Sequence, residues 1–364
     1  MSRLQVIVLG MHRSGTSVVT RLINLMGCHL GDESDLLPAK PDNPKGFWER
    51  RDAYRLNREI FAAAHCSWFS VLGPIEPEHL PSREARRLQA RVEEIVTGLT
   101  EHGPWVLKDP RLALVLPFWS PFLQRPVAVI PHRRPGQVAE SLHLRDGIPP
   151  SVGVALWELY NLSALRVTRG IPRIVVGYEE LLQRPVETAR WLQTRLSELG
   201  GTAELREPPA GTVESFVSTD LFRARGEAIV EHDYLNERRG DLLAFLAGNR
   251  SREPASILSS DSRELLEFFS EARKALIERE ERLVLADTEM KSEEEIGELG
   301  PLGASWRRLE QIEEQVAHER RVMERSRGVL DVQEARLAGL GDQIERIGIE
   351  RGSRLADGWA DADG

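Results

Sequence analysis

Cysteine is scarce in this chain of 364 residues, which contains only Cys28 and Cys66. Two thiols cannot build a disulfide framework, and neither lies in the C-x-x-C or mixed Cys/His spacing of a zinc site. We therefore expect two reduced thiols and a fold that depends on its apolar core, for which a hydrophobic content of 41% is sufficient.

Long apolar runs are also missing from the sequence. No stretch approaches the roughly 20 residues that a membrane helix requires. The apolar part of the first ten residues has the length of a strand, and it lacks the layout of a signal peptide. These features predict a protein without a transmembrane segment that resides in the cytoplasm.

Positive charge is not in excess, because 48 lysines and arginines stand against 57 acidic residues and give a formal net charge of -9. Nucleic-acid backbones favour clustered cations, so we expect no nucleic-acid partner. Any anion that this protein binds must be held by local contacts. The sequence also shows no recognisable cluster of carboxylates and histidines, and we expect no metal.

Short apolar runs alternate with amphipathic stretches over the first 200 residues. The expected strands are 4–9, 105–107, 127–131 and 174–176, and the expected helices are 17–26, 138–144, 152–167 and 186–199. This alternation predicts an α/β fold, a P-loop-like three-layer domain with a central parallel sheet. Residues 201–212 have the composition of a loop.

The alternation ends near residue 225, which suggests a first domain over 1–225. The remaining chain is interpreted as a helical extension over 226–290, a linker over 291–308, a coiled-coil-like helix over 309–350 and a disordered tail over 351–364. Between 309 and 347, apolar residues recur every seven positions with charges between them. This helix is predicted to mediate self-association or to bind a partner helix, and the alternative is a solvated helix that folds back on the first domain.

A glycine-containing loop follows the first expected strand. Residues 10–17 read Gly-Met-His-Arg-Ser-Gly-Thr-Ser, with the length and position of the phosphate loop G-x-x-x-x-G-K-[ST]. Backbone amides, the helix N-terminus and the hydroxyls of Ser14, Thr16 and Ser17 suit a phosphate or sulfate. Thr16 replaces the lysine that kinases use, whereas Arg13 places a cation within the loop.

Residues 13–17, Arg-Ser-Gly-Thr-Ser, resemble the 5'-phosphosulfate loop of sulfotransferases that use 3'-phosphoadenosine 5'-phosphosulfate (PAPS). Bacterial members have G-M-H-R-S-G-T-S followed by N-P-K-G-F-W-E, which matches residues 43–49. Their 3'-phosphate motif, R-x-P with a serine eight places after the arginine, is matched by Arg133 and Ser141. The segments 108–110 and 178–182 resemble two further motifs, so the similarity covers about residues 6–199.

This resemblance implies sulfuryl transfer from PAPS to a hydroxyl acceptor without a metal. The implied cofactor-binding residues are Arg13, Ser14, Gly15, Thr16, Ser17, Arg133 and Ser141, and the implied catalytic residues are Glu49, Lys108 and Arg13. Arg13 and the loop would hold the departing 5'-phosphate, while Lys108 would stabilise charge on the transferred group. Glu49 is the preferred general base, because its aromatic neighbours can raise its proton affinity.

Alternatives remain for several of these residues. Glu33 also lies downstream of the first helix and is the second candidate for the base. Lys108 has an alternative role in an ion pair with Asp109. His12 and His132 border the phosphate motifs, and we expect both to act indirectly.

No motif identifies the acceptor, which is a small molecule or a glycan. The resemblance favours a hydroxyl of a carbohydrate or glycolipid, with amines and small phenols as further options. Candidate stacking residues are the aromatics Trp48, Trp68, Phe69 and Trp157, although tryptophan more often packs in a core. Two other functions stay open: a P-loop kinase of small molecules, and a non-catalytic nucleotide-binding scaffold that acts through its coiled coil.

Overall fold

The computed structural model describes residues 3–39, 43–201, 205–217, 235–272 and 274 of the chain. The predicted linker, coiled-coil-like helix and tail, which together span 291–364, lie outside these residues. Among the helices that are described, none is long and apolar enough to cross a membrane.

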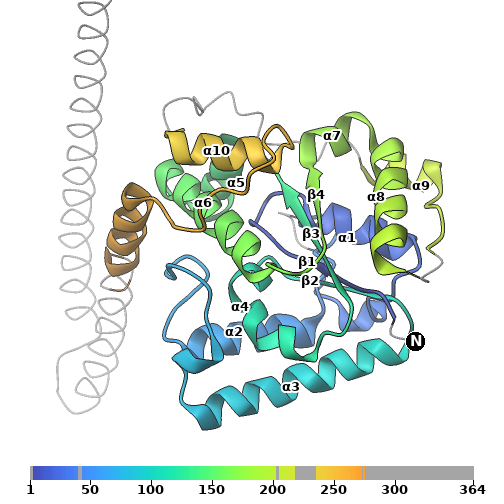
Figure 1. Cartoon of the computed structure of the whole chain (residues 1–364), viewed down its shortest axis with the longest axis horizontal. Helices are drawn as coiled ribbons and strands as arrows, with labels where there is room; N and C mark the ends of the chain where they lie inside the picture. The colour runs from blue at the N-terminus through green and yellow to red at the C-terminus, as the bar shows by residue number, and fades with distance from the viewer. Residues whose placement is uncertain (1–2, 40–42, 202–204, 218–234, 273, 275–364) are drawn as a thin grey trace, which may run out of the picture. The chain divides into compact units, whose positions relative to one another are not determined.

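Four parallel strands form one sheet in the order β2-β1-β3-β4 (Figure 1). The strands are β1 (Gln5–Val8), β2 (Trp105–Lys108), β3 (Pro126–His132) and β4 (Arg173–Gly177). Each of the four predicted strands is confirmed to within one residue at either end. Val8 at the end of β1 pairs with Lys108 of β2 and with Val129 of β3, so the loop after β1 begins beside Lys108.

Helices cover both faces of the sheet (Figure 1). The helices are α1 (Thr16–Leu25), α2 (Arg51–Ala63), α3 (Ser82–Glu101), α4 (Leu112–Trp119), α5 (Pro135–Asp146), α6 (Pro150–Val167), α7 (Tyr178–Gln183), α8 (Pro185–Gly200), α9 (Ala210–Phe216) and α10 (Glu237–Leu246). Val6 and Val8 share an apolar cluster with residues of α1 and α8, whereas Ile7 belongs to a second cluster with α2, α3, α4 and α6. Because successive strand residues point to opposite faces, this division confirms the three layers.

The loop predicted over residues 201–212 is wrong at its end, since α9 begins at Ala210. Pro209 directly precedes the first residue of α9. Proline is tolerated there because a backbone N–H at the start of a helix has no hydrogen-bond partner within the helix. Val213 is fully buried in the cluster that contains α1 and α8. Packing of Val213, together with Val217 and Phe216, therefore stabilises a short helix in a segment with loop composition.

All four strands end at the same edge of the sheet, because they are parallel. Gly10 follows β1, Asp109 follows β2, Arg133 follows β3 and Tyr178 begins α7 directly after β4. The carboxyl edge of a parallel sheet is where ligands of α/β proteins bind. The segments that carry the sequence motifs are thus brought to one place, although they are spread from Gly10 to Tyr178 in the sequence.

α10 packs against α6 through a buried ion pair. Glu158 of α6 is 1% exposed and accepts hydrogen bonds from Arg239 Nε at 2.9 Å and from the hydroxyls of Ser259 and Ser262 at 2.7 Å each. This contact places α10 in the same compact unit as the sheet.

Candidate active site

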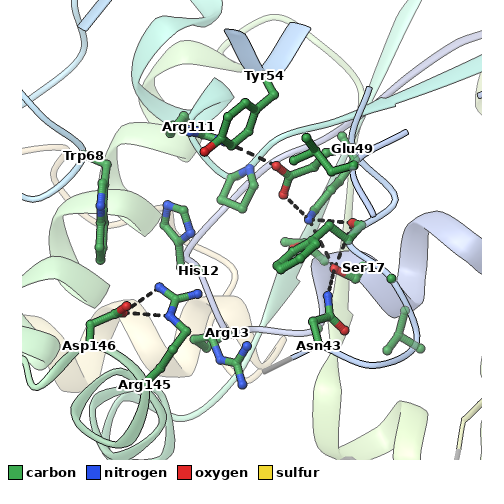
Figure 2. A pocket seen from close by; sticks show the side chains of 18 of the residues that line it. His12, Arg13, Ser17, Asn43, Glu49, Tyr54, Trp68, Arg111, Arg145 and Asp146 are labelled. Atoms are coloured by element: carbon green, nitrogen blue, oxygen red, sulfur yellow. Dashed lines mark hydrogen bonds and ion pairs between the residues drawn. The ribbon is translucent and has the colours of Figure 1, made fainter. Parts of the chain in front are cut away.

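A cavity of about 990 Å³ lies at the carboxyl edge of the sheet (Figure 2). Its walls are formed by the loop between β1 and α1, by the segment before α2, by one side of α2, by residues 66–68 and by the residues that follow β2. The described part of the chain contains no group of three or more side chains arranged to hold a metal ion.

The loop between β1 and α1 has the conformation that an anion site needs. Gly15 has a φ of +88° and directly precedes α1, so the unpaired amides of the first helical turn lie at the cavity wall. A side chain on Gly15 would meet the ring of Tyr178 at 2.4 Å. The amides of this turn fit a phosphate or sulfate group. The hydroxyl of Ser14 is buried without a partner among the described residues, and Ser14 does not line the cavity.

The two phosphate motifs of the sequence meet in space. Arg13 Nε donates to Ser141 Oγ at 2.8 Å, although 128 positions separate these residues in the chain. Arg133 Nη1 donates to the carbonyl of Arg13 at 3.3 Å, and the carbonyl of Arg133 accepts from Trp157 Nε1 at 2.9 Å. Arg13 and Arg133 line the cavity, whereas Ser141 lies behind Arg13 and does not.

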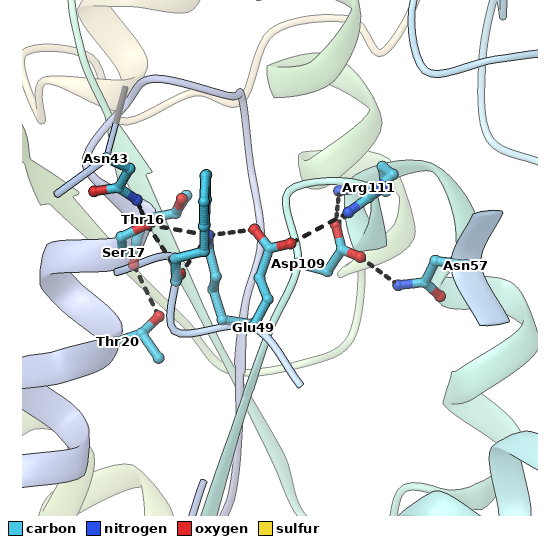
Figure 3. A network of polar contacts seen from close by, with 10 residues as sticks. Thr16, Ser17, Thr20, Asn43, Glu49, Asn57, Asp109 and Arg111 are labelled. Carbon is cyan, nitrogen blue, oxygen red and sulfur yellow. Dashed lines mark hydrogen bonds and ion pairs between the residues drawn. The ribbon is translucent and has the colours of Figure 1, made fainter. Parts of the chain in front are cut away.

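A buried ion pair stands next to the loop (Figure 3). Lys108 Nζ is 2.6 Å from Glu49 Oε1, and these side chains are 2% and 7% exposed. Lys108 also donates to Ser17 Oγ at 3.2 Å and to the carbonyl of Phe47 at 3.0 Å. The lysine therefore connects the phosphate loop to the carboxylate that precedes α2.

Glu49 has a second cation on its other oxygen, and a chain of hydrogen bonds fixes that cation (Figure 3). Arg111 Nη2 is 3.3 Å from Glu49 Oε2, and Arg111 Nε donates to Asp109 Oδ1 at 2.8 Å. Asp109 Oδ2 accepts from Asn57 Nδ2 at 2.8 Å, and Asn57 accepts from Trp119 Nε1 at 3.0 Å. The carboxylate of Glu49 is thereby held between two immobilised cations.

Burial is the largest influence on Glu49 and raises its pKa above the ordinary value of a glutamate. Lys108 opposes that effect, Asp109 adds to it, and Arg111 also opposes it. The net pKa stays raised. A carboxylate with raised proton affinity in a cavity is the type of group that acts as a general base near neutral pH.

The structure distinguishes the alternatives that the sequence left open. Glu33 is exposed and does not line the cavity, whereas Glu49 does. The alternative ion pair between Lys108 and Asp109 is wrong: Lys108 pairs with Glu49, while Asp109 pairs with Arg111 at 2.8 Å. Asp109 instead points toward α2, where Asn57 supplies its second hydrogen bond.

The four candidate stacking aromatics have different environments. Only Trp68 lines the cavity. Trp157 is fully buried in the core, and Phe69 packs edge-on against Phe269. Trp48 contacts Phe216 and carries the guanidinium of Arg21 at 4.4 Å from its ring centre.

Several cavity residues were not assigned a role from the sequence. Tyr54 and Arg58 of α2, Arg111 after β2, and Arg145 near the end of α5 all line the cavity. Arg111 had a local signal, since it lies three residues beyond Lys108 at the end of a strand. Tyr54 and Arg58 of α2 had no such signal, because a polar residue on an amphipathic helix is normally predicted to face the solvent.

Neither the scan of protein-family models nor the search of curated proteins returns a match. Among solved structures, the sulfotransferase domain of the olefin synthase from Synechococcus PCC 7002 is 16% identical with a TM-score of 0.37, over 73% of this chain and 94% of that one. A sulfotransferase from Mycobacterium avium is 16% identical with a TM-score of 0.34, over 70% of this chain and 78% of that one. The sulfotransferase domain from the curacin biosynthetic pathway is 17% identical with a TM-score of 0.34, over 73% and 96%.

The matching structures are sulfotransferases. They belong to the class that the sequence motifs resemble.

Proposed function

We propose that this protein is a sulfotransferase that uses PAPS and transfers its sulfuryl group to a hydroxyl of a carbohydrate or glycolipid. The observation that carries this proposal is the Glu49–Lys108 pair, 2.6 Å apart and next to the lysine-free phosphate loop. Glu49 would thus supply the base and Lys108 the cation for the leaving group, side by side in the cavity.

The cavity fits the donor by its chemistry. Arg13 and the first amides of α1 would bind the 5'-phosphosulfate, and Arg133 would bind the 3'-phosphate. Ser141 would act through Arg13, to which it is bonded at 2.8 Å. When bound, PAPS supplies the sulfuryl group and an adenosine 3',5'-bisphosphate leaving group.

Each of the charged residues near the loop has a separate role in the proposed transfer. Glu49 accepts the proton of the acceptor hydroxyl as the new oxygen–sulfur bond forms and the bond from sulfur to the 5'-phosphate oxygen breaks. Lys108 and Arg13 stabilise the negative charge that develops on that oxygen. Arg111 holds Glu49 in place and, together with Lys108, limits the rise in its pKa.

The proposal is tested by thermal-shift titration of the full chain. Adenosine 3',5'-bisphosphate without metal should raise the melting temperature, and ATP with Mg²⁺ should do so less, because the loop lacks the kinase lysine. Arg133→Ala should weaken bisphosphate binding by roughly 2 to 4 kcal/mol. Arg134→Ala is the matched control, since that arginine is exposed and does not line the cavity.

Sulfur-labelled PAPS offered to host extracts would then identify the labelled acceptor. A preference for ATP with Mg²⁺ would point to the kinase instead. Binding of the bisphosphate without any transfer of label would favour the non-catalytic scaffold.

A further inference from the structure

The cavity is strongly positive in a chain whose formal charge is -9. Seven arginines and lysines line it against two carboxylates, Glu49 and Asp146. The proposed donor accounts for three of these cations, Arg13, Lys108 and Arg133. Four other cations line the cavity, Lys45, Arg58, Arg111 and Arg145.

Two of the remaining cations have unused hydrogen-bond donors. Arg145 is bound to Asp146 through Nε at 2.7 Å and Nη2 at 2.6 Å, and no partner is recorded for its Nη1 among the described residues. Arg58 makes no hydrogen bond or ion pair with another described residue, and its guanidinium lies 5.8 Å from the ring centre of Tyr54. Both side chains line the cavity.

The same end of the cavity is aromatic (Figure 2). Trp68 lines it, and the hydroxyl of Tyr160 donates to the Trp68 carbonyl at 2.9 Å, which fixes the segment that carries the indole. Tyr54 lines it as well and has Arg111 4.2 Å from its ring centre. Such flat apolar faces suit the C–H face of a sugar ring.

His12 adds a neutral hydrogen-bonding group between these residues (Figure 2). Its ring lies 4.7 Å from that of Trp68 and 5.4 Å from that of Tyr160, and its Nε2 is buried without a partner in the described part of the chain. Burial lowers the pKa of His12 well below its usual value, and the nearby Arg145 and Arg111 lower it further. The imidazole is therefore uncharged at neutral pH and can donate or accept a hydrogen bond.

We propose that this end of the cavity, formed by His12, Tyr54, Arg58, Trp68 and Arg145, is the acceptor subsite and that it selects an anionic sugar. The acceptor would carry a carboxylate or phosphate in addition to the hydroxyl that is sulfated. This inference rests on the proposed function and names the substrate class of that same site.

The physical reason is the balance of charge and shape. A sugar ring that packs on Trp68 places its hydroxyls between His12 and the Glu49 carboxylate, while its anion reaches the free donors of Arg58 and Arg145. Hydrogen bonds between charged groups are stronger than those between neutral groups. A neutral sugar would leave these two guanidinium groups without that gain.

The test is a thermal-shift titration of the full chain that is already saturated with adenosine 3',5'-bisphosphate, so that the donor site is filled. The probes are glucuronate, glucose 6-phosphate, methyl glucoside and inorganic phosphate, at matched ionic strength. We expect glucuronate or glucose 6-phosphate to stabilise the complex more than methyl glucoside or inorganic phosphate does. The better of the two identifies the anionic group as carboxylate or phosphate.

Variants locate the effect in the acceptor subsite. Arg58→Gln combined with Arg145→Gln should weaken binding of the anionic sugar roughly tenfold or more and leave bisphosphate binding unchanged. Arg55→Gln is the matched control, because Arg55 is an exposed arginine of the same helix that does not line the cavity. It should behave as the unaltered protein.

Equal or better binding of methyl glucoside would overturn the inference, as would unchanged anion binding in the double variant. Stabilisation by inorganic phosphate equal to that by the sugar phosphate would also overturn it, since the site would then be a simple anion site. Failure of the bisphosphate to bind at the start would instead contradict the proposed function itself.

Discussion

Glu49 is a carboxylate that the fold buries between two cations. Lys108 lies 2.6 Å from one of its oxygens and Arg111 3.3 Å from the other. A buried ion pair of this kind is weak evidence for stability, because desolvation of the charges offsets much of their attraction. Its position in the cavity, beside the loop between β1 and α1, agrees with the proposed role of Glu49 as the general base.

Replacing Glu49 by glutamine should lower the rate of transfer by about 10²- to 10⁴-fold, since the side chain keeps its shape but can no longer take a proton. The affinity for adenosine 3',5'-bisphosphate, measured by titration, should change little. Glu33→Gln is the control and should retain turnover. The opposite pattern would make Glu33 the base.

The pH profile gives an independent view of the same group. Only the ionised carboxylate can accept the proton, and burial raises the pKa of Glu49. We therefore expect kcat/KM to fall on the acid side at a pH above the range in which an ordinary glutamate titrates. The Glu49→Gln variant should not show this fall in kcat/KM on the acid side. If the variant still shows the fall, another residue is the group that titrates.

At the scale of elements, the loop between β1 and α1 depends on close packing with the start of α7. Gly15 has a φ of +88°, and a Cβ there would lie 2.4 Å from the Tyr178 ring. The same ring lies 4.9 Å from the guanidinium of Arg133. Gly15 and Arg133, to which phosphate binding is proposed, therefore pack against the same tyrosine ring.

Gly15→Ala should destabilise the protein by roughly 1 to 3 kcal/mol, because the left-handed backbone becomes strained and Tyr178 must move. It should also weaken bisphosphate binding. Urea unfolding and thermal-shift titration measure the two effects. Gly98→Ala is the control, since Gly98 lies inside α3 with nothing within 4 Å, and it should be neutral or slightly stabilising.

At the scale of the whole compact unit, α10 is attached to α6 by the pair Glu158–Arg239, whose side chains are 2% and 9% exposed. Two serine hydroxyls complete the hydrogen bonds of Glu158. This buried ion pair therefore holds α10 against α6, in addition to the apolar contacts that Leu242 and Leu246 make with the core.

Arg239→Met should lower the free energy of unfolding by about 3 to 5 kcal/mol, because it leaves Glu158 buried without its cation. Denaturant unfolding of the full chain measures this loss. Arg238→Met removes an exposed arginine from the same helix and should change stability little. Equal effects of the two substitutions would show that the buried pair contributes nothing specific.

The sequence by itself determined the local elements and the residues of the phosphate loop. Apolar periodicity is a property of neighbouring residues, so the four strands and the helices α1, α5, α6 and α8 could be predicted to within a few positions. The helices α2, α3 and α4 were not predicted. Arg13, Arg133 and Lys108 were found because each stands in a short motif at the end of a strand. The predictions for residues 291–364 stay predictions.

Only the tertiary structure decided which charges face each other. The pairs Lys108–Glu49 and Arg111–Glu49 join the residues at and after the end of β2 to the segment before α2. The hydrogen bonds from Asn57 to Asp109 and from Trp119 to Asn57 add α2 and α4 to the same network, and these residues have no periodic relation in the chain. The side of the cavity that is proposed to bind the acceptor likewise combines α2, residues 66–68 and α5. Such contacts depend on how helices pack on the sheet, and packing is set by the summed burial of many side chains, which no local pattern records.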